Sequence, residues 1–327
     1  MKALIFENPE QAVVSDVPMP SVKDTEVLVK TAAIGICHSD YELLAGRYII
    51  PIAYPVTPGH EWSGEIVEVG KAVKGYKVGD RVVGECVYRT PERIHHFGFS
   101  TNGADREYFT VEPQLLHQLP DAISYKGASL IEPFTCGFYA VLRSGGTNAS
   151  ETVVVSGGGT IGLVSAAAAI GMGARVIVLD PIAARRETAK KIGAFDALDP
   201  TAEGTLETIR DLTNGAGADM VVEASGHDSS LARVFDYVRE EGRVSMVGIN
   251  IGRQVPVVLG NIQLKNITVR GCIGSPGVWP AAIRFLERTG LDLSPIQTHE
   301  YPLAKAVDAF EFGKDPRKSI KITIMAA

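Results

Sequence analysis

Residues 151–180 read ETVVVSGGGTIGLVSAAAAIGMGARVIVLD, and this stretch decides the fold of the second half of the chain. A short valine-rich run is followed by a glycine-rich turn, an alanine-rich segment of helical length, and a second β-branched run that ends at Asp180. Apolar runs of this length, separated by a turn and a helix, are typical of buried parallel strands. The stretch therefore predicts a strand–helix–strand unit.

The turn satisfies the pattern G-x-G-x-x-G at Gly157-Gly158-Gly159-Thr160-Ile161-Gly162. In this pattern the first glycine permits the tight turn, the second lets the backbone approach a pyrophosphate, and the third lets the helix pack closely on the strand. The N–H groups at the start of the helix attract phosphate oxygens. Because the turn follows a strand and opens a helix, it predicts a dinucleotide-binding site.

An acidic residue ends the second strand, where the dinucleotide fingerprint places a carboxylate that binds the adenosine ribose. Asp180 occupies that place, and its charge would repel a 2′-phosphate. We therefore expect NAD as the cofactor rather than NADP. Arg185 and Arg186 follow closely and would favour NADP, so Arg185 is included among the candidate cofactor contacts.

Helical and strand-like segments alternate beyond Asp180, which predicts a parallel sheet of repeated βαβ units in an α/β fold. The helical segments are ARRETAKKIGA (184–194), LARVFDYVREEG (231–242) and PAAIRFLERTG (280–290). The strand-like segments are DMVVEASG (219–226), RVSMVGIN (243–250) and the closing KSIKITIM (318–325).

The first third of the chain has a different character. Its β-branched runs EVLVKTAAIGI (26–36), GEIVEVG (64–70) and DRVVGECV (80–87) are separated by glycine-rich turns. This pattern predicts a barrel-like β region with little helix up to about residue 125. A length of 327 residues agrees with two domains, since a domain has roughly 100–200 residues.

Composition excludes several classes of function. The net charge of −6 and the lack of a long basic tract give no electrostatic support for nucleic-acid binding. No apolar stretch has the length of a membrane span, and the N-terminal MKALIFENPE lacks the apolar core of a signal peptide. We therefore expect a cytoplasmic protein that does not bind a membrane.

Two short motifs carry side chains that bind metals. GICHSD (35–40) contains Cys37, and GHEWSG (59–64) contains His60 and Glu61. A thiolate, an imidazole and a carboxylate suit Zn²⁺, and three protein ligands leave a position open for a substrate oxygen. Taken singly, a cysteine is more often a buried apolar residue and a His-Glu pair is more often at the surface, so the motifs around them decide the question.

The chain resembles the zinc-dependent medium-chain dehydrogenases, which include the alcohol and polyol dehydrogenases. The resemblance covers essentially the whole sequence and rests on GICHSD, GHEWSG, VGDRV (78–82), IEPFTCGFYAV (131–141), the glycine turn and KSIKI (318–322). It implies a GroES-like β-barrel catalytic domain over residues 1–133 and 274–327. It also implies a doubly wound Rossmann domain over residues 134–273.

The resemblance also implies one catalytic zinc. Cys37 and His60 match zinc ligands, and Glu132 holds the position of the third ligand, as in the sorbitol and threonine dehydrogenase branch. Glu61 can also approach the metal, directly or during ligand exchange. Asp40 matches the carboxylate that orients the ligand histidine. The cysteine-rich lobe that holds a second, structural zinc in many relatives is shortened here, so we expect no structural zinc.

The implied reaction is the reversible, NAD-linked oxidation of a secondary alcohol to a ketone. Zinc favours formation of the alkoxide, and hydride passes to the nicotinamide. Ser39 matches the hydroxyl that starts the proton relay. Glu42 stands where many relatives continue that relay with a histidine, so Glu42 or Glu61 would carry protons onward.

Further residues are implied by position. They are the cofactor contacts His38, Cys136, Gly226, Val247, Gly248, Ile249 and Lys321, and the substrate-pocket residues Tyr48, Phe99 and Ile273. Glu132 favours a polyol or cyclitol, whereas the apolar pocket would also admit a cyclic alcohol. A homodimer or homotetramer is expected, paired through the β-rich segment NITVRGCIG (266–274).

Two other functions deserve comparison. A zinc-free quinone or enone reductase of the same fold would lack the cysteine and histidine ligands. A non-catalytic protein would have no reason to keep both the ligands and the glycine turn. The presence of Cys37, His60, Glu61 and Glu132 argues against both.

Overall fold

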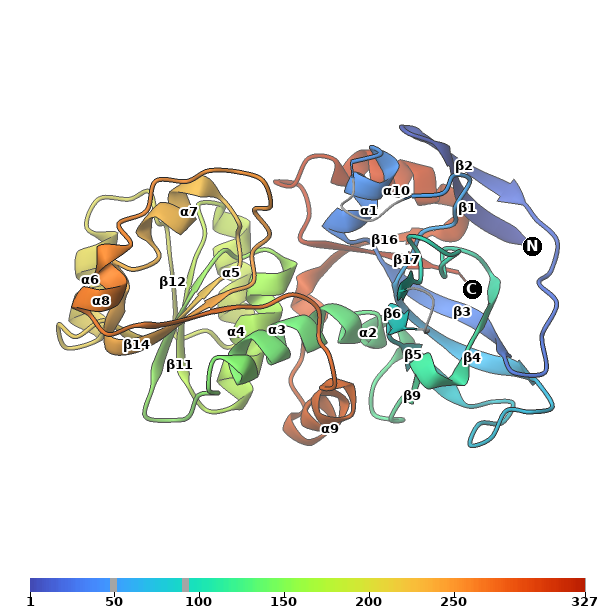
Figure 1. Cartoon of the computed structure of the whole chain (residues 1–327), viewed down its shortest axis with the longest axis horizontal. Helices are drawn as coiled ribbons and strands as arrows, with labels where there is room; N and C mark the ends of the chain where they lie inside the picture. Colours follow the sequence, from blue (N-terminus) through green and yellow to red (C-terminus); the bar gives the residue numbers. More distant parts are fainter. Residues whose placement is uncertain (48–51, 90–93, 327) are drawn as a thin grey trace. The chain divides into compact units, whose positions relative to one another are not determined.

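The computed structural model describes residues 1–47, 52–89 and 94–326 (Figure 1). The chain forms two units: residues 1–132 with 297–327, and residues 133–296. Each unit is described by itself. Among the described residues, no helix is long and apolar enough to cross a membrane.

The first unit is built on a seven-stranded sheet in the order β16-β17-β3-β4-β5-β9, with β8 also paired to β3. These pairs are antiparallel except for β16 with β17. Two smaller pairs, β1 with β2 and β6 with β7, complete the strands described there. The bounds are β1 (Lys2–Asn8), β2 (Gln11–Asp16), β3 (Val27–Gly35), β4 (Glu61–Val69), β5 (Arg81–Gly84), β6 (Val87–Arg89), β7 (Ile94–His96), β8 (Tyr108–Val111), β9 (Leu116–Gln118), β16 (Gln297–Pro302) and β17 (Lys321–Met325).

The core of this unit is apolar and aromatic. The indole of Trp62 meets the ring of Phe109 edge-on at 4.7 Å, and Phe6 meets Phe310 in the same way at 5.4 Å. Edge-to-face contacts of buried rings add to the stabilisation that area burial gives. This packing fixes β4, the strand that begins with Glu61, within the sheet.

Little helix was expected before residue 125, and the short helix α1 (His38–Leu44) lies in this region. Cys37 is its N-cap, and the Asp40 carboxylate accepts a hydrogen bond from the Cys37 backbone N–H at 2.8 Å. A carboxylate three residues after the cap stabilises a helix start by this bond. The other helices of the unit are α2 (Tyr125–Ala128), α10 (Ala306–Gly313) and the 3₁₀ turns η1 (Pro113–Leu115) and η3 (Leu303–Lys305).

The second unit contains a six-stranded parallel sheet in the order β12-β11-β10-β13-β14-β15. The α/β class and the doubly wound parallel sheet are confirmed. The order reverses direction between β10 and β13, which is the switch point where open α/β sheets bind ligands. The strands are β10 (Thr152–Ser156), β11 (Arg175–Leu179), β12 (Asp196–Leu198), β13 (Ala218–Glu223), β14 (Val238–Met246) and β15 (Thr268–Gly271). The helices are α3 (Ile131–Arg143, beginning in the first unit), α4 (Thr160–Gly171), α5 (Ala183–Lys191), α6 (Thr205–Leu212), α7 (Asp228–Arg233), α8 (Gly260–Leu264), α9 (Trp279–Thr289) and the 3₁₀ turn η2 (Ser294–Ile296).

The expected helix over residues 231–242 is wrong beyond Arg233. Helix α7 ends at Arg233, and β14 begins at Val238. Val238 pairs with Ala218 at the start of β13, and Phe235 and Tyr237 are buried in the core of the unit. Strand pairing and core packing decide the structure of this segment, because tertiary packing overrides helical spacing in a short segment.

The second unit extends to Ile296, whereas the sequence suggested a return to the first unit near residue 274. Helix α9 accounts for the difference. Its Phe285 packs against Phe134 at 6.1 Å and Phe138 at 5.0 Å, both on α3. Phe285 also covers Gly171, where an added Cβ would lie 2.5 Å from the ring. These contacts tie α9 to the second unit.

Candidate functional site

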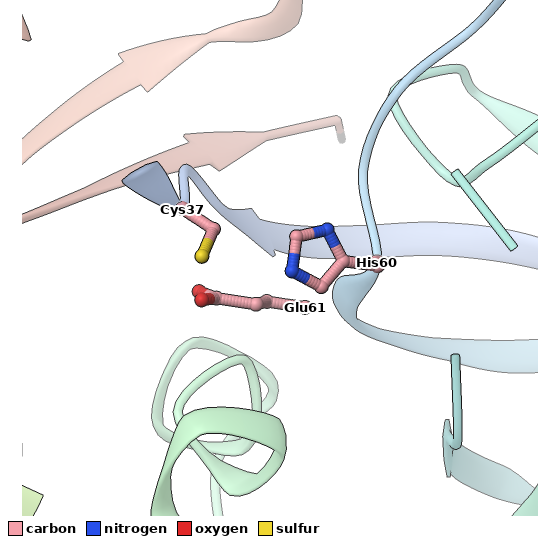
Figure 2. Close-up of side chains that lie close together, drawn as sticks. All are labelled: Cys37, His60 and Glu61. Carbon is pink, nitrogen blue, oxygen red and sulfur yellow. The ribbon is translucent and has the colours of Figure 1, made fainter. Parts of the chain in front are cut away.

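Cys37, His60 and Glu61 lie together, and one potential ligand atom from each is within 4.8 Å of the others (Figure 2). The register of the sheet brings the two motifs together, because Gly35 at the end of β3 pairs with Glu61 at the start of β4. A side chain at Gly35 would collide with the Glu61 carboxylate, so the glycine leaves room for it. The three side chains thus converge on one point from the segment after β3 and from the start of β4.

The imidazole of His60 is held on two sides. Its Nδ1 is 3.3 Å from Asp40 Oδ1, and its ring packs on Phe99 with 4.6 Å between centroids. Burial is the largest single effect and lowers the pKa of His60, but the charge and hydrogen bonding of Asp40 and of Cys37 together raise that pKa well above its ordinary value. Asp40 is itself 1% exposed and fixed to the α1 N-cap. This arrangement orients the histidine toward Cys37 and Glu61.

Glu61 is paired with Lys321. The ammonium Nζ lies 2.8 and 2.6 Å from the two carboxylate oxygens and donates a third bond to Ile36 O at 2.8 Å. Both side chains are buried, and the Glu61 carboxylate raises the pKa of Lys321 although burial opposes its charge. An ammonium has three N–H donors, and Lys321 makes three bonds to Glu61 and Ile36. The resemblance implies a contact between Lys321 and a cofactor phosphate, whereas its partners here are these two residues.

Glu132 lies outside the group of three, among the described residues searched for such groups. The Cys86 thiol donates to Glu132 Oε1 across 3.8 Å. Burial raises the pKa of Glu132 to about 7; the charge of Glu61 adds to this rise, whereas His60 and Lys321 oppose it. Burial also raises the pKa of the Cys86 thiol. Cys86 is thus a neighbour of Glu132 that the motifs did not indicate.

Asp105 is a second residue that sequence reasoning missed. Its carboxyl is 1% exposed, and Gly59, the residue before His60, packs directly against it. Burial raises its pKa well above the ordinary value, and the charge of Asp40 adds to the rise. The signal in the sequence is weak: the polar pair Asp105-Arg106 stands shortly before the strand-like run YFTV (108–111).

The predicted relay residues differ in their surroundings. The buried Oγ of Ser39 has no hydrogen-bond partner within the described part of the chain. Glu42 accepts two hydrogen bonds from Arg47, at 3.4 and 3.2 Å, and lies 3.9 Å from the exposed imidazole of His38. The pocket residue Tyr48 lies outside the described residues.

The predicted dinucleotide turn connects β10 to α4. Gly157 has φ of +109°, and Gly159 is the N-cap of α4, which begins at Thr160. A Cβ at Gly162 would collide with the Gly157 carbonyl. The tight turn and the close helix–strand packing both require glycine here. The N–H groups at the start of α4 form the geometry that binds phosphate.

Asp180 follows β11 beside this turn. Its carboxylate accepts bonds from the N–H groups of Gly158 and Ile182, both at 2.8 Å, and Arg185 Nη1 lies 3.5 Å away. Arg186 donates to the Asp180 carbonyl at 2.7 Å and to Asp199 at 3.3 Å. Both arginines therefore already have acidic partners near the turn.

The remaining predicted cofactor contacts of this unit lie mostly after β13 and β14. Gly226 and Gly248 approach each other so closely that a side chain on Gly248 would collide with the Gly226 N–H. Val247 follows β14 directly, and Ile249 is 64% exposed. Two others lie elsewhere on the unit: Cys136 on α3 is half-buried, and Ile273, predicted for the substrate pocket, is 66% exposed.

Known families match both units. Residues 23–121 match the family described as alcohol dehydrogenase GroES-like domain, and residues 160–288 match zinc-binding dehydrogenase. The chain is 33% identical to D-arabitol-phosphate dehydrogenase of Enterococcus avium, covering 92% of this chain and 90% of the relative. It is 31% identical to sorbitol dehydrogenase of Bacillus subtilis, covering 95% and 93%. The structure of 2R,3R-butanediol dehydrogenase from Bacillus subtilis matches with a TM-score of 0.91 and 28% identity, covering 100% of this chain and 99% of that one.

The glycine turn on a parallel sheet, together with a cluster of metal-binding side chains, defines a dehydrogenase that uses a nicotinamide cofactor and a metal. The chain belongs to the zinc-type medium-chain dehydrogenase family, with a GroES-like domain and a Rossmann domain. It is therefore an oxidoreductase that acts on alcohols. The resemblance stated from its motifs is confirmed.

Proposed function

We propose that the protein oxidises a secondary alcohol group of a small polyol, cyclitol or cyclic alcohol to a ketone, reversibly, with one catalytic zinc and NAD. The observation that carries this proposal is the convergence of Cys37, His60 and Glu61 within 4.8 Å. The curated relatives include dehydrogenases of sorbitol and of D-arabitol phosphate, which supports a polyol-like substrate.

The donor set fits zinc. A thiol, an imidazole and carboxyl groups are the ligands that Zn²⁺ prefers, and a catalytic site uses three of them. Cys37 and His60 would hold the metal, with Glu132 as the third ligand and Glu61 as the group that approaches it during turnover. Asp40, which lies 3.3 Å from His60 Nδ1, would fix the orientation of the imidazole.

Bound zinc supplies a Lewis acid that favours loss of the proton from the substrate hydroxyl. Ser39 would bind that hydroxyl, because its buried Oγ has no other partner among the described residues. Ser39 Oγ would then pass the proton outward. We predict that Glu42 accepts the proton in the next step. In this structure its carboxylate accepts a hydrogen bond from Arg47. Phe99, which covers the His60 ring, would form an apolar wall of the substrate site.

Metal analysis combined with a substrate screen tests the proposal. Zinc per chain is measured by plasma mass spectrometry, and NAD⁺ reduction is followed over polyols, polyol phosphates, cyclitols and cyclic secondary alcohols. About one zinc per chain and a turned-over alcohol are expected. Protein free of zinc after purification without chelators, but active in reducing quinones or enones, would refute the proposal in favour of a zinc-free reductase.

The preference for NAD is a further part of the proposal. Asp180→Ala is expected to raise the KM for NAD⁺ about tenfold, because the ribose hydroxyls lose a charged acceptor worth about 1.5 kcal/mol or more. It should also narrow the preference for NAD⁺ over NADP⁺. Initial rates with both cofactors measure this effect. Asp199→Asn, which alters the neighbouring Arg186 pair and the bonds from Thr201 but leaves Asp180 in place, is the matched control. An unchanged preference in Asp180→Ala would show that Asp180 does not contact the ribose.

We also propose that the chain forms a homodimer or homotetramer through the edge of the parallel sheet. Strand β15 is the last strand of that sheet and is exposed along its length. Apolar side chains gather in the same part of the chain, at Ile251, Val258, Leu259, Leu264 and Val269. Exposed strand edges and large apolar patches mark contact surfaces.

A double substitution tests this surface. Leu264→Glu with Val269→Glu is expected to convert the oligomer to smaller species, because each buries a charge in the contact. Light scattering coupled to gel filtration gives the mass. Met19→Glu, at an exposed apolar residue of the first unit, is the control. A wild-type protein that is monomeric at micromolar concentration would contradict the proposal.

A further inference from the structure

A buried carboxylate that has no cationic partner among the described residues lies at the switch point of the parallel sheet. Glu223 is the last residue of β13 and is fully buried. Its Oε1 accepts bonds from Ser225 N at 3.1 Å, Ser225 Oγ at 2.7 Å and Ser230 Oγ at 2.8 Å. The Gly226 N–H donates to both oxygens, at 3.2 Å each. Backbone N–H and hydroxyl groups are thus its donors among the described residues.

These bonds connect several segments at one edge of the sheet. The Glu223 carbonyl accepts bonds from the N–H groups of Val247 and Gly248, both at 2.9 Å. Ser230, on α7, also bonds to Ser156 at the end of β10, at 2.7 Å. Glu223 therefore ties the end of β13 to the loop after it, to α7, and to the turn after β14.

The same loop supports the glycine turn. Gly157 packs so closely on Ser225 that an added Cβ would lie 2.9 Å from the Ser225 backbone nitrogen. A Cβ on Gly248 would collide with Glu223 Oε2. The position of Glu223 thus sets how the turn at Gly157 and the loops at Gly226 and Gly248 lie relative to one another.

An isolated buried carboxylate is costly and persists only where several donors satisfy it. A carboxylate is also the side chain that offers two oxygens and no donor. A glutamine oxygen at the Oε1 position would keep the bonds made there, but the amide nitrogen would replace Oε2 at 3.2 Å from the Gly226 nitrogen, so that two donors would meet. Glutamate avoids this contact.

We propose that Glu223 is a positioning residue for the dinucleotide: it holds the loops that form the cofactor crevice and touches no reacting atom. This inference rests on the proposed NAD site. It predicts that changing Glu223 affects cofactor binding more than the chemical step, since a displaced wall weakens binding while Ser39 and the metal ligands belong to the other unit.

The test compares two carboxylates on the same strand. Asp219 lies near the start of β13, where it accepts bonds from Thr152 N at 2.7 Å and Arg239 Nε at 2.8 Å, far along the strand from the glycine turn. Fluorescence titration gives the Kd of NADH for wild type, Glu223→Gln and Asp219→Asn. Their KM and kcat with NAD⁺ and their Tm are measured as well.

Glu223→Gln is expected to raise the Kd of NADH and the KM of NAD⁺ about tenfold, with kcat at saturating cofactor within about twofold. Asp219→Asn is expected to lower Tm without a comparable change in Kd. Ser230→Ala, which removes one donor to Glu223, should raise the Kd of NADH about threefold. This variant replaces Glu223→Gln in the test if Glu223→Gln does not fold.

Two results would overturn the inference. One is an unchanged Kd in Glu223→Gln and Ser230→Ala, with or without a loss of Tm. The other is an equal rise in Kd in Asp219→Asn, which would show a general effect of destabilising the sheet. Failure of the proposed NAD site is distinguishable, because the wild-type protein itself would then not bind NADH, whereas failure of the zinc chemistry would leave NADH binding intact and would appear only in the metal analysis.

Discussion

Cys37→Ser and His60→Ala are each expected to remove zinc and to lower kcat/KM by about 10³-fold or more, while the Kd for NADH stays within about twofold. A catalytic metal supplies several kcal/mol of charge stabilisation, and each 1.36 kcal/mol is a factor of ten in rate. The cofactor turn belongs to the second unit, whereas both ligands belong to the first. Metal content, steady-state rates with the best alcohol of the screen and NADH titration measure the three quantities.

Matched controls are available for both side chains. Cys272→Ser alters a half-buried cysteine of the second unit, and His117→Ala alters a histidine that pairs with Glu85 at 2.8 Å. Both variants should keep zinc and most of the activity. Normal turnover in Cys37→Ser or His60→Ala would contradict a zinc mechanism. A parallel loss of NADH binding would indicate misfolding instead, which the melting temperatures reveal.

The parallel sheet could be predicted because its signals are local. The run from Thr152 to Asp180 contains a strand, a turn and a helix in consecutive residues, and each follows from periodicity or from glycine. The error at residues 231–242 arose where local spacing and tertiary packing disagree. There Val238 pairs with Ala218 in the parallel sheet instead of continuing the helix.

The candidate metal residues could be predicted by type and motif, but their partners could not. The pairing of Glu61 with Lys321 depends on two strand registers: Gly35 opposite Glu61, and Gly35 opposite Thr323. Nothing near Lys321 in the sequence indicates a buried carboxylate. Asp105 and Cys86 were missed for the same reason, because each reaches the site through the fold rather than through a motif.

The buried ion pair of Glu61 and Lys321 should contribute strongly to the stability of the protein. Lys321→Met is expected to lower the free energy of unfolding of the metal-free protein by about 3–5 kcal/mol, because it leaves the buried Glu61 carboxylate without its cation. Glu61 is 1% exposed and Lys321 is 3% exposed, so water cannot replace the lost partner. Urea denaturation in the presence of a chelator measures the loss without the stabilisation that bound metal adds.

The partner substitution separates the ion pair from packing. In Glu61→Gln with Lys321→Met both charges are gone, so the double variant should recover most of the stability that either single variant loses, a coupling of several kcal/mol. Lys126→Met is the surface control: Lys126 also pairs with a glutamate, Glu300, at 2.8 Å, but both are partly exposed and the cost should be about 1 kcal/mol or less. If Lys321→Met costs no more than Lys126→Met, the buried pair of Glu61 and Lys321 does not stabilise the fold more than an exposed ion pair does, and this prediction is wrong.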